Sequence, residues 1–323
     1  MPQPDARTVH VDTLLSTISV AAMQNSQEFI ASRVFPRVVV SKQSDLYPTF
    51  DQNDWLRDEA QLRAPASESA GSGYNVGTDN YFAKVYAFHK DVDDQTANNT
   101  DAAYGDPEAT AAEFVTEKML LTMEKQWHAA YFKTGVWTGS STGTDITPAA
   151  PWDNYATSTP VRDIRAQARA IRMKGVRSPN TLVLSDAVYT ALLDHPDFVD
   201  RIKNVSDAVI TRDIVRRFFE VDNLYVSSGI QATNAEGGTP TIAPIASDYA
   251  LLVYAPPSPS LMTPSGGYTF VWDGVSDGAG LEIGTVRIEI PEKRVVRIES
   301  QMAWDFKVVS PLAGALFTGV LSS

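Results

Sequence analysis

The chain has 323 residues, enough for two lobes or one large elaborated fold, and its composition of 43% hydrophobic and 20% charged residues is that of a folded globular protein. Because 39 acidic residues face 27 basic ones, the formal charge is -12, which excludes a protein whose main surface binds nucleic-acid phosphates. The absence of cysteine excludes disulfides, thiolate metal sites and cysteine nucleophiles.

Membrane and export signals are also missing from the sequence. Residues 1–10 lack the charged-then-apolar pattern of a secretory signal, and no run of about 18 apolar residues occurs. We therefore expect a chain that is made and used in a cytoplasm, with no membrane partner.

Residues 1–33 mix polar and apolar positions, with loose helical spacing between Val11 and Met23. Two interpretations have equal support. The segment is either an arm that lies on another surface or an ordinary first helix.

Strand patterns follow at residues 34–40, 47–50 and 81–89, where β-branched and aromatic residues dominate. Between the second and third lies a polar stretch, residues 51–80, rich in Asp, Ala, Ser and Gly. Hairpin loops usually have about two to five residues, so this connection is far too long for a compact hairpin. It is either disordered or ordered by another molecule.

The clearest element is a helix predicted over residues 107–134. Asp106 is a good N-cap, Pro107 suits the first turn, and Gly135 supplies a stop. Its apolar stripe advances in steps of three or four and consists of Ala112, Val115, Met119, Met123, Trp127 and Tyr131. Such a helix is about 42 Å long, which makes it a spine for the molecule.

Residues 135–160 are rich in Gly, Ser, Thr and Pro and form the best candidate boundary. Beyond them the sequence alternates between helix and strand patterns, as in an α/β lobe. We expect helices at 161–174, 185–193 and 211–219 and strands at 181–184, 224–226 and 249–254. Strand patterns then return at 285–290, 295–298 and 304–309.

This order of elements resembles the major capsid proteins of tailed double-stranded DNA bacteriophages. The resemblance covers essentially the whole chain and is carried by residues 114–120, 178–185 and 304–313. Their Hong Kong ninety-seven-type fold is shared with encapsulins and the herpesvirus capsid floor. The implied fold class is α+β, with an N-terminal arm (1–33), a peripheral domain (34–155 and 285–323) and an α/β axial domain (156–284). The peripheral domain would include an extended loop (41–90) and the spine helix (107–134).

The resemblance also implies a function and partners. The chain would assemble as hexamers and pentamers into an icosahedral shell, in the cytoplasm of a host bacterium, and remain in the virion. Portal, scaffolding or decoration proteins would be further partners, and packaged double-stranded DNA would make weak local contacts. Some family members crosslink through a Lys in the extended loop and an Asn near the C-terminus. Residues 51–80 contain no Lys and no Asn follows Asn234, so crosslinking by that route is not expected here.

Two sets of residues are candidates for contacts between subunits. One helix face carries arginines at steps of three, four and three, namely Arg162, Arg165, Arg169 and Arg172. This face is either a solvated surface, an ion-pairing surface between subunits, or a contact for packaged DNA. The second set lies in the extended loop and consists of Trp55, Arg57 and Arg63.

Chemical motifs are weak throughout, so we expect no catalytic, cofactor or metal site and no enzyme activity. Residues 139–143 match Gly-x-Ser-x-Gly but lack the strand before and the helix after that a nucleophile elbow needs. Glu124 and His128 could share a metal, yet only two ligands are visible, so a packed histidine is expected. Residues 91–95 resemble a calcium loop without its glycine and are better interpreted as a turn. Two alternative functions stay open, an encapsulin-type compartment and a carboxylate-dependent hydrolase.

Overall fold

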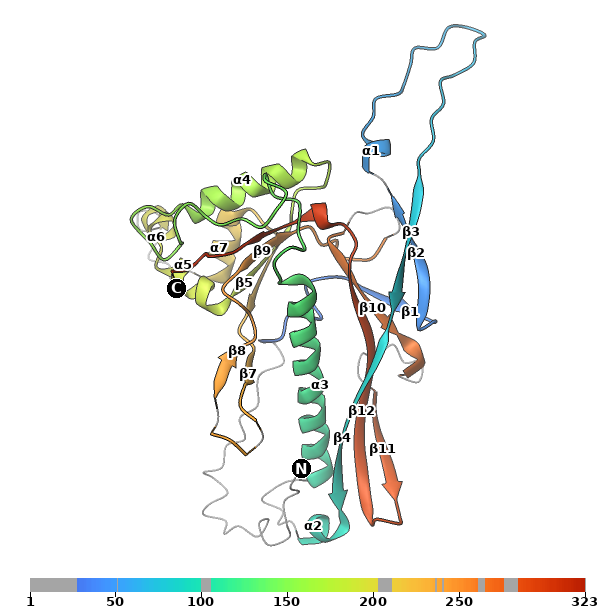
Figure 1. Ribbon diagram of the computed structural model, residues 1–323, viewed down its shortest axis with the longest axis vertical. Coiled ribbons are helices and arrows are strands. Elements are labelled where there is room, and N and C mark those ends of the chain that lie inside the picture. The colour runs from blue at the N-terminus through green and yellow to red at the C-terminus, as the bar shows by residue number, and fades with distance from the viewer. Residues whose placement is uncertain are drawn as a thin grey trace.

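The computed structural model describes residues 28–50, 52–99, 106–202, 211–235, 237–239, 241–260, 265–275 and 284–322 (Figure 1). A long helix stands in the centre, an α/β lobe lies to one side, and a sheet with a projecting hairpin lies to the other. The choice between an arm and a helix for residues 1–27 lies outside the described residues.

The central helix is α3 (Pro107–Tyr131), close to the predicted 107–134. Asp106 accepts a hydrogen bond from the backbone N–H of Glu108, as its position as N-cap predicts, and Gly135 has a φ of 77°, which favours glycine. The predicted stripe faces the core, because Val115, Met119 and Trp127 are buried against the neighbouring strands.

A five-stranded sheet lies beside α3 and is built around one long strand, β12 (Val295–Val308). Its members are β1 (Arg37–Val40), β4 (Lys84–Asp93), β10 (Gly267–Trp272), β11 (Gly284–Ile290) and β12. We predicted β12 as two strands because polar residues interrupt its apolar pattern. One of them, Ser300, is buried and bonds the Thr285 side chain across the sheet, so the strand continues through it. The short α2 (Asp94–Asn99) follows β4 directly, so residues 91–95, expected to be a turn, are the end of the strand and the start of the helix.

The extended loop begins as a two-stranded hairpin of β2 (Ser44–Phe50) and β3 (Val76–Phe82). The pattern predicted as one strand at 81–89 is in fact the end of β3 and most of β4. They are separated at Ala83, which is fully buried and donates its N–H to the Gln43 carbonyl. Beyond the hairpin the chain continues through α1 (Gln52–Trp55) into a long loop.

The α/β lobe has a four-stranded sheet in the order β13-β9-β5-β6. The strands are β13 (Gly314–Phe317), β9 (Ala250–Val253), β5 (Thr181–Ser185) and β6 (Asn223–Ser227). One sheet face, including Leu182 and Leu184 of β5, packs on the helices, while Val183 faces the core around α3. The helices are α4 (Pro160–Met173), α5 (Asp186–Leu193), α6 (Pro196–Ile202) and α7 (Arg212–Phe219). A small hairpin of β7 (Ile230–Ala232) and β8 (Ile242–Pro244) extends from the lobe.

Two strands cross the domain boundaries that the resemblance implied. β10 lies within residues 156–284 but pairs with β1 and β12 in the five-stranded sheet. β13 lies within residues 285–323 but pairs with β9 in the lobe. Each of the two sheets therefore contains one strand from the sequence range that was assigned to the other domain.

The connection at 135–160, the candidate boundary, contains buried side chains. Trp137 and Trp152 are buried in the two large core clusters. The backbone N–H of Trp152 bonds the Val320 carbonyl, and Ile146 bonds the Leu316 carbonyl. The connection therefore packs against the C-terminal strand and belongs to the folded body.

Candidate assembly surfaces

The β2–β3 hairpin and its loop project beyond the rest of the molecule (Figure 1). At the base, the Tyr81 ring stacks on Phe270 with ring centres 4.5 Å apart, and Asp305 accepts a hydrogen bond from the Phe82 N–H. Tyr47 donates to the Asp79 carboxylate at 2.8 Å, which lowers the pKa of Asp79. The base is thus fixed to the body, and among the described residues the contacts of the loop end lie within the loop itself.

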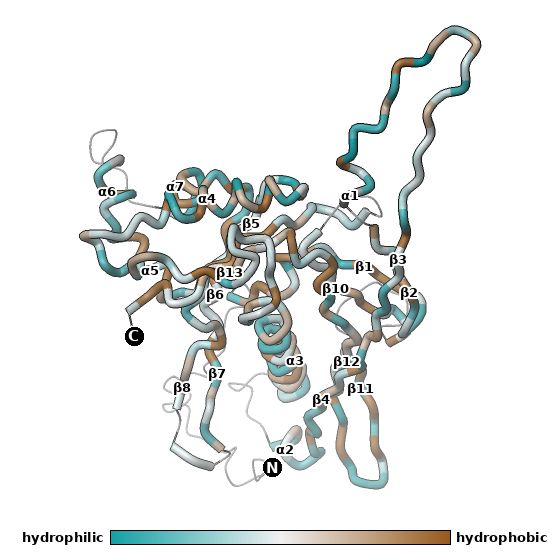
Figure 2. The backbone as a smooth tube through the Cα atoms, turned by 45° about the horizontal axis from the view of Figure 1, so that its top comes forward, coloured by the Kyte–Doolittle hydropathy of each residue, from teal (hydrophilic) through white to brown (hydrophobic). Residues whose placement is uncertain are grey.

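Large apolar side chains lie in this projecting loop without a core to cover them. Trp55 is 54% exposed and Leu62 is fully exposed at 103%, with Leu56 and Tyr74 also exposed. In Figure 2 hydrophobic segments interrupt an otherwise polar loop. Exposed apolar residues grouped on one projection indicate a surface that another molecule covers.

The three contact candidates in the loop are at its surface, and each has a neighbour within the loop. The Trp55 ring lies 5.4 Å from the Tyr74 ring, and an Arg57 nitrogen lies 3.9 Å from a Glu59 oxygen. Arg63 donates from Nε to the Ser67 carbonyl at 2.6 Å, across a turn closed by the Ser67 N–H and the Ala64 carbonyl. The loop end therefore has local order of its own.

The arginine stripe lies on α4 as its spacing predicted. All four arginines are exposed, while Val161, Ile164 and Ile171 on the neighbouring face are buried. Arg165 pairs with Glu220 at 2.7 Å and donates to the Phe218 carbonyl. Within the described part of the chain, Arg162, Arg169 and Arg172 have no ion pair or hydrogen bond. They form a cationic strip on one edge of the lobe.

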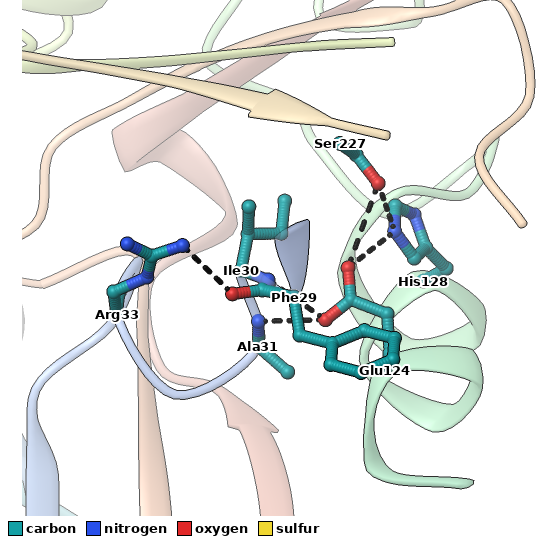
Figure 3. Close-up of polar contacts among 7 residues, drawn as sticks. All are labelled: Phe29, Ile30, Ala31, Arg33, Glu124, His128 and Ser227. Atoms are coloured by element: carbon teal, nitrogen blue, oxygen red, sulfur yellow. Dashed lines mark hydrogen bonds and ion pairs between the residues drawn. The ribbon is translucent and has the colours of Figure 1, made fainter. Parts of the chain in front are cut away.

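A buried polar junction lies where α3, β6 and the first described residues meet (Figure 3). Glu124 is fully buried, and its Oε2 accepts the backbone N–H groups of Ile30 at 2.9 Å and Ala31 at 2.8 Å. Its Oε1 lies 3.1 Å from His128 Nε2, which also lies 2.9 Å from Ser227 Oγ. We call Glu124, His128, Ser227 and these two N–H groups the Glu124 junction.

The Glu124 junction links three parts of the fold through hydrogen bonds. Across the residues that the structure describes, no group of three or more His, Asp or Glu side chains could hold a metal ion. The expectation of a packed histidine is met, since His128 is buried among Trp127 and Phe132. Sequence reasoning saw the Glu124 and His128 pair but not its partners, because two of them are backbone N–H groups.

The remaining motifs have structural roles. Ser140 of the Gly-x-Ser-x-Gly match is buried and donates to the Thr144 carbonyl, in a loop that follows α3 without an intervening strand. Among the described residues, no helix is both long enough and apolar enough to cross a membrane.

Two sequence comparisons match parts of the chain. A family model described as "Phage major capsid protein E" matches residues 140–253. The major capsid protein of Burkholderia phage BcepMu is 26% identical over 234 residues, which are 70% of this chain and 71% of that protein.

Solved structures match along nearly the full chain. A phage-related protein from Bordetella bronchiseptica aligns with a TM-score of 0.68 and 21% identity, covering 96% of this chain and 97% of that one. The capsid of cyanophage P-SCSP1u aligns at 0.59 and 9% identity, covering 93% and 89%. The encapsulin of Synechococcus elongatus aligns at 0.56 and 12% identity, covering 96% of both chains. The predicted fold class is confirmed, and the chain has the capsid fold of the tailed-phage major capsid proteins, which it also resembles in sequence.

Proposed function

We propose that this protein is the major capsid subunit of an icosahedral shell that encloses the double-stranded DNA of a tailed phage. One structural observation supports the proposal in addition to the similarity to capsid proteins. The loop at 52–75 leaves the body on a well-anchored hairpin and exposes large apolar side chains. Such exposed apolar side chains are a liability on a monomer, and a neighbouring copy that covers them would remove it.

Shell formation follows from repetition of such contacts. Copies arranged head to tail around an axis form closed rings, here hexamers and pentamers, in which each loop meets the next subunit. Individual contacts of modest size become strong together, since every subunit engages several neighbours at once. Trp55, Arg57 and Arg63 would lie in these contacts.

Other partners follow from the same proposal. Portal, scaffolding or decoration proteins would complete the particle, which assembles in the bacterial cytoplasm and becomes the virion shell. Because the formal charge is -12, packaged DNA would meet the shell through weak local contacts only.

The alternative is an encapsulin-type compartment, which the fold match to the Synechococcus protein supports. The matches to phage capsid proteins in sequence favour the phage shell. A carboxylate-dependent hydrolase gains no support from two acids of the five-stranded sheet region, Asp91 and Glu108, because each is paired with an arginine. The pKa of Asp91 is lowered by hydrogen bonds from Arg297 and that of Glu108 by hydrogen bonds from Arg287, so both serve as structural ion pairs.

The test uses the full chain expressed alone and together with the other head genes of its phage. Size-exclusion chromatography and negative-stain microscopy should show closed shells. In a variant with Trp55, Leu56 and Leu62 changed to Ser, shells should be lost while the circular dichroism of the subunit is unchanged. A wild-type chain that stays small under all these conditions would refute the proposal, as would a triple variant that assembles normally.

A further inference from the structure

Basic side chains are concentrated on two helices of the lobe, α4 and α7. These helices contain seven of the chain's 27 basic residues within 22 of its 323 positions. All seven are arginines, namely Arg162, Arg165, Arg169, Arg172, Arg212, Arg216 and Arg217. The formal charge is +3 for α4 and +2 for α7, so the rest of the chain carries -17. An acidic protein is thus locally cationic here.

The two helices present their arginines on adjacent surfaces. Both bury their apolar sides in the same cluster, for example through Ile164 of α4 and Val215 of α7. They lie side by side at the edge of the lobe in Figure 2, and Arg165 of α4 donates to the Phe218 carbonyl of α7 at 3.3 Å. Because Arg165 belongs to the arginine stripe, the stripe lies on the flank of α4 that faces α7. We call the seven arginines the α4–α7 basic surface.

Four of these arginines are available to a partner. The other three have partners within the lobe, namely Arg165 with Glu220, Arg216 with Asp213, and Arg212 over the Tyr189 ring. The four are exposed, and within the described part of the chain they have no ion pair or hydrogen bond. They are Arg162, Arg169, Arg172 and Arg217. Arg162 and Arg172 lie ten positions apart on α4, about 15 Å along the helix axis. The surface is therefore long enough for several contacts with one extended partner.

The chemistry of this surface fits phosphate groups better than a second protein. The core of an interface between proteins is depleted of charged residues. Among the described residues of α4 and α7, the large apolar side chain that stays exposed is Met173, at the end of α4. Interfaces with DNA are much more positively charged than those between proteins, and a guanidinium can bind two phosphate oxygens at once. Charge complementarity therefore selects a polyphosphate as the partner.

We propose that the α4–α7 basic surface binds the phosphate backbone of double-stranded DNA. This inference rests on the proposed shell function, in which DNA lies against the subunits, and it names the surface that makes the contact. Contacts to phosphates carry no direct sequence information, so the binding has no base preference. The acidic remainder of the chain repels DNA, which confines the contact to this surface and keeps it weak.

The experiment measures binding of the unassembled full chain to a short fluorescent DNA duplex by fluorescence anisotropy, over a series of salt concentrations. The main variant carries Arg162→Gln, Arg169→Gln and Arg172→Gln. It should bind the duplex at least tenfold more weakly at low salt. The slope of log K against log salt concentration should fall by about 2.7, because each lost phosphate contact removes about 0.9. Circular dichroism checks folding, and Arg169→Gln alone, with an expected fall of about 0.9, replaces the triple variant if that one does not fold.

Two controls separate position from total charge. One carries Lys at the same three positions of α4, which keeps the charge. The other carries Lys84→Gln, Lys125→Gln and Lys133→Gln, which lower the net charge by the same amount at exposed positions outside α4 and α7. Both controls should bind the duplex like the wild type. In shells made with the other head genes, the main variant should assemble in normal yield but retain less DNA.

The inference is overturned if the wild-type chain does not bind the duplex, or if the main variant binds no more weakly than the lysine control. It is also overturned if the folded main variant builds no shells, since the stripe would then belong to a contact between copies. Failure of the shell function itself would differ. The wild type would then form no shells, whereas the duplex assay uses the unassembled chain and does not depend on them.

Discussion

The carboxylate of Glu124 accepts the backbone N–H of Ala31 at 2.8 Å, although 93 positions separate the two residues in the chain. The same oxygen accepts the N–H of Ile30, so one buried side chain of α3 fixes the point at which residues 28–34 join the body. The following turn is closed by the N–H groups of Arg33 and Val34 on the Ile30 carbonyl. The Glu124 junction therefore ties the N-terminal part of the chain to the spine helix.

Replacing Glu124 with Ala should loosen this attachment. Two buried N–H groups would lose their acceptor, which costs about 1 to 3 kcal/mol for each group left unpaired. Glu124→Gln keeps one accepting oxygen and should cost less. The measurements are the free energy of unfolding in urea and the rate of trypsin cleavage after Arg33, an exposed residue just beyond the junction. The free energy of unfolding should rise from Ala to Gln to wild type, and the rate of cleavage should fall in the same order.

Glu113→Gln provides the matched control, because Glu113 is exposed on the same helix. It should leave the unfolding free energy and the cleavage rate unchanged. An Ala variant at Glu124 that resists trypsin as well as the wild type does would show that the junction does not hold this segment.

Elements with strong local signals could be predicted from the sequence. The start of α3 follows from Asp106 and Pro107, and the start of α5 follows from Ser185, whose side chain accepts the Val188 N–H. The arginine stripe was equally visible, since helical spacing alone puts its members on one face.

Elements that depend on distant partners were missed. β13 follows β12 by only a few residues, yet it crosses to the lobe and pairs with β9, a choice that no local pattern encodes. α6 was missed because the residue before it is His195, which is not a usual N-cap. The partners of Glu124 and His128 were missed, and two of them are backbone N–H groups, which every sequence contains.

Any side chain at position 314 should destabilise the fold. A Cβ there would lie 2.3 Å from Cε3 of Trp137. That ring cannot retreat, because it is buried and its Nε1 donates to the Tyr131 carbonyl at 2.7 Å. Overpacking of this kind costs about 1 to 3 kcal/mol or more. Gly314→Ala should therefore lower the melting temperature by several degrees, measured by circular dichroism.

Gly71→Ala serves as the control for this prediction. Nothing lies within 4 Å of a Cβ at Gly71, in the projecting loop. Its melting temperature should match that of the wild type. Equal melting temperatures for the two Ala variants would mean that the packing of Trp137 against β13 is looser than the structure indicates.

His195 caps α6 in its neutral form. Its Nδ1 accepts the Asp197 N–H at 3.0 Å, and its Nε2 lies 2.8 Å from Ser158 Oγ, which donates to the Asn154 carbonyl. A second proton would have to sit on Nδ1, facing the Asp197 N–H. Burial lowers the pKa of His195 below its ordinary value of 6.5, and the Asp197 carboxylate opposes this only in part.

The folded chain should therefore lose stability as the pH falls below about 6.5, because the unfolded state binds a proton there that the folded state does not. The loss grows until the pH passes the lowered pKa and is then complete. His195→Gln has no titrating ring but can still accept the Asp197 N–H, so its urea midpoint should depend less on pH over this window. Above pH 7 the slopes of the two proteins should agree. If the variant and the wild type lose stability in parallel between pH 6.5 and 4.5, then another group causes the pH dependence of stability and His195 does not.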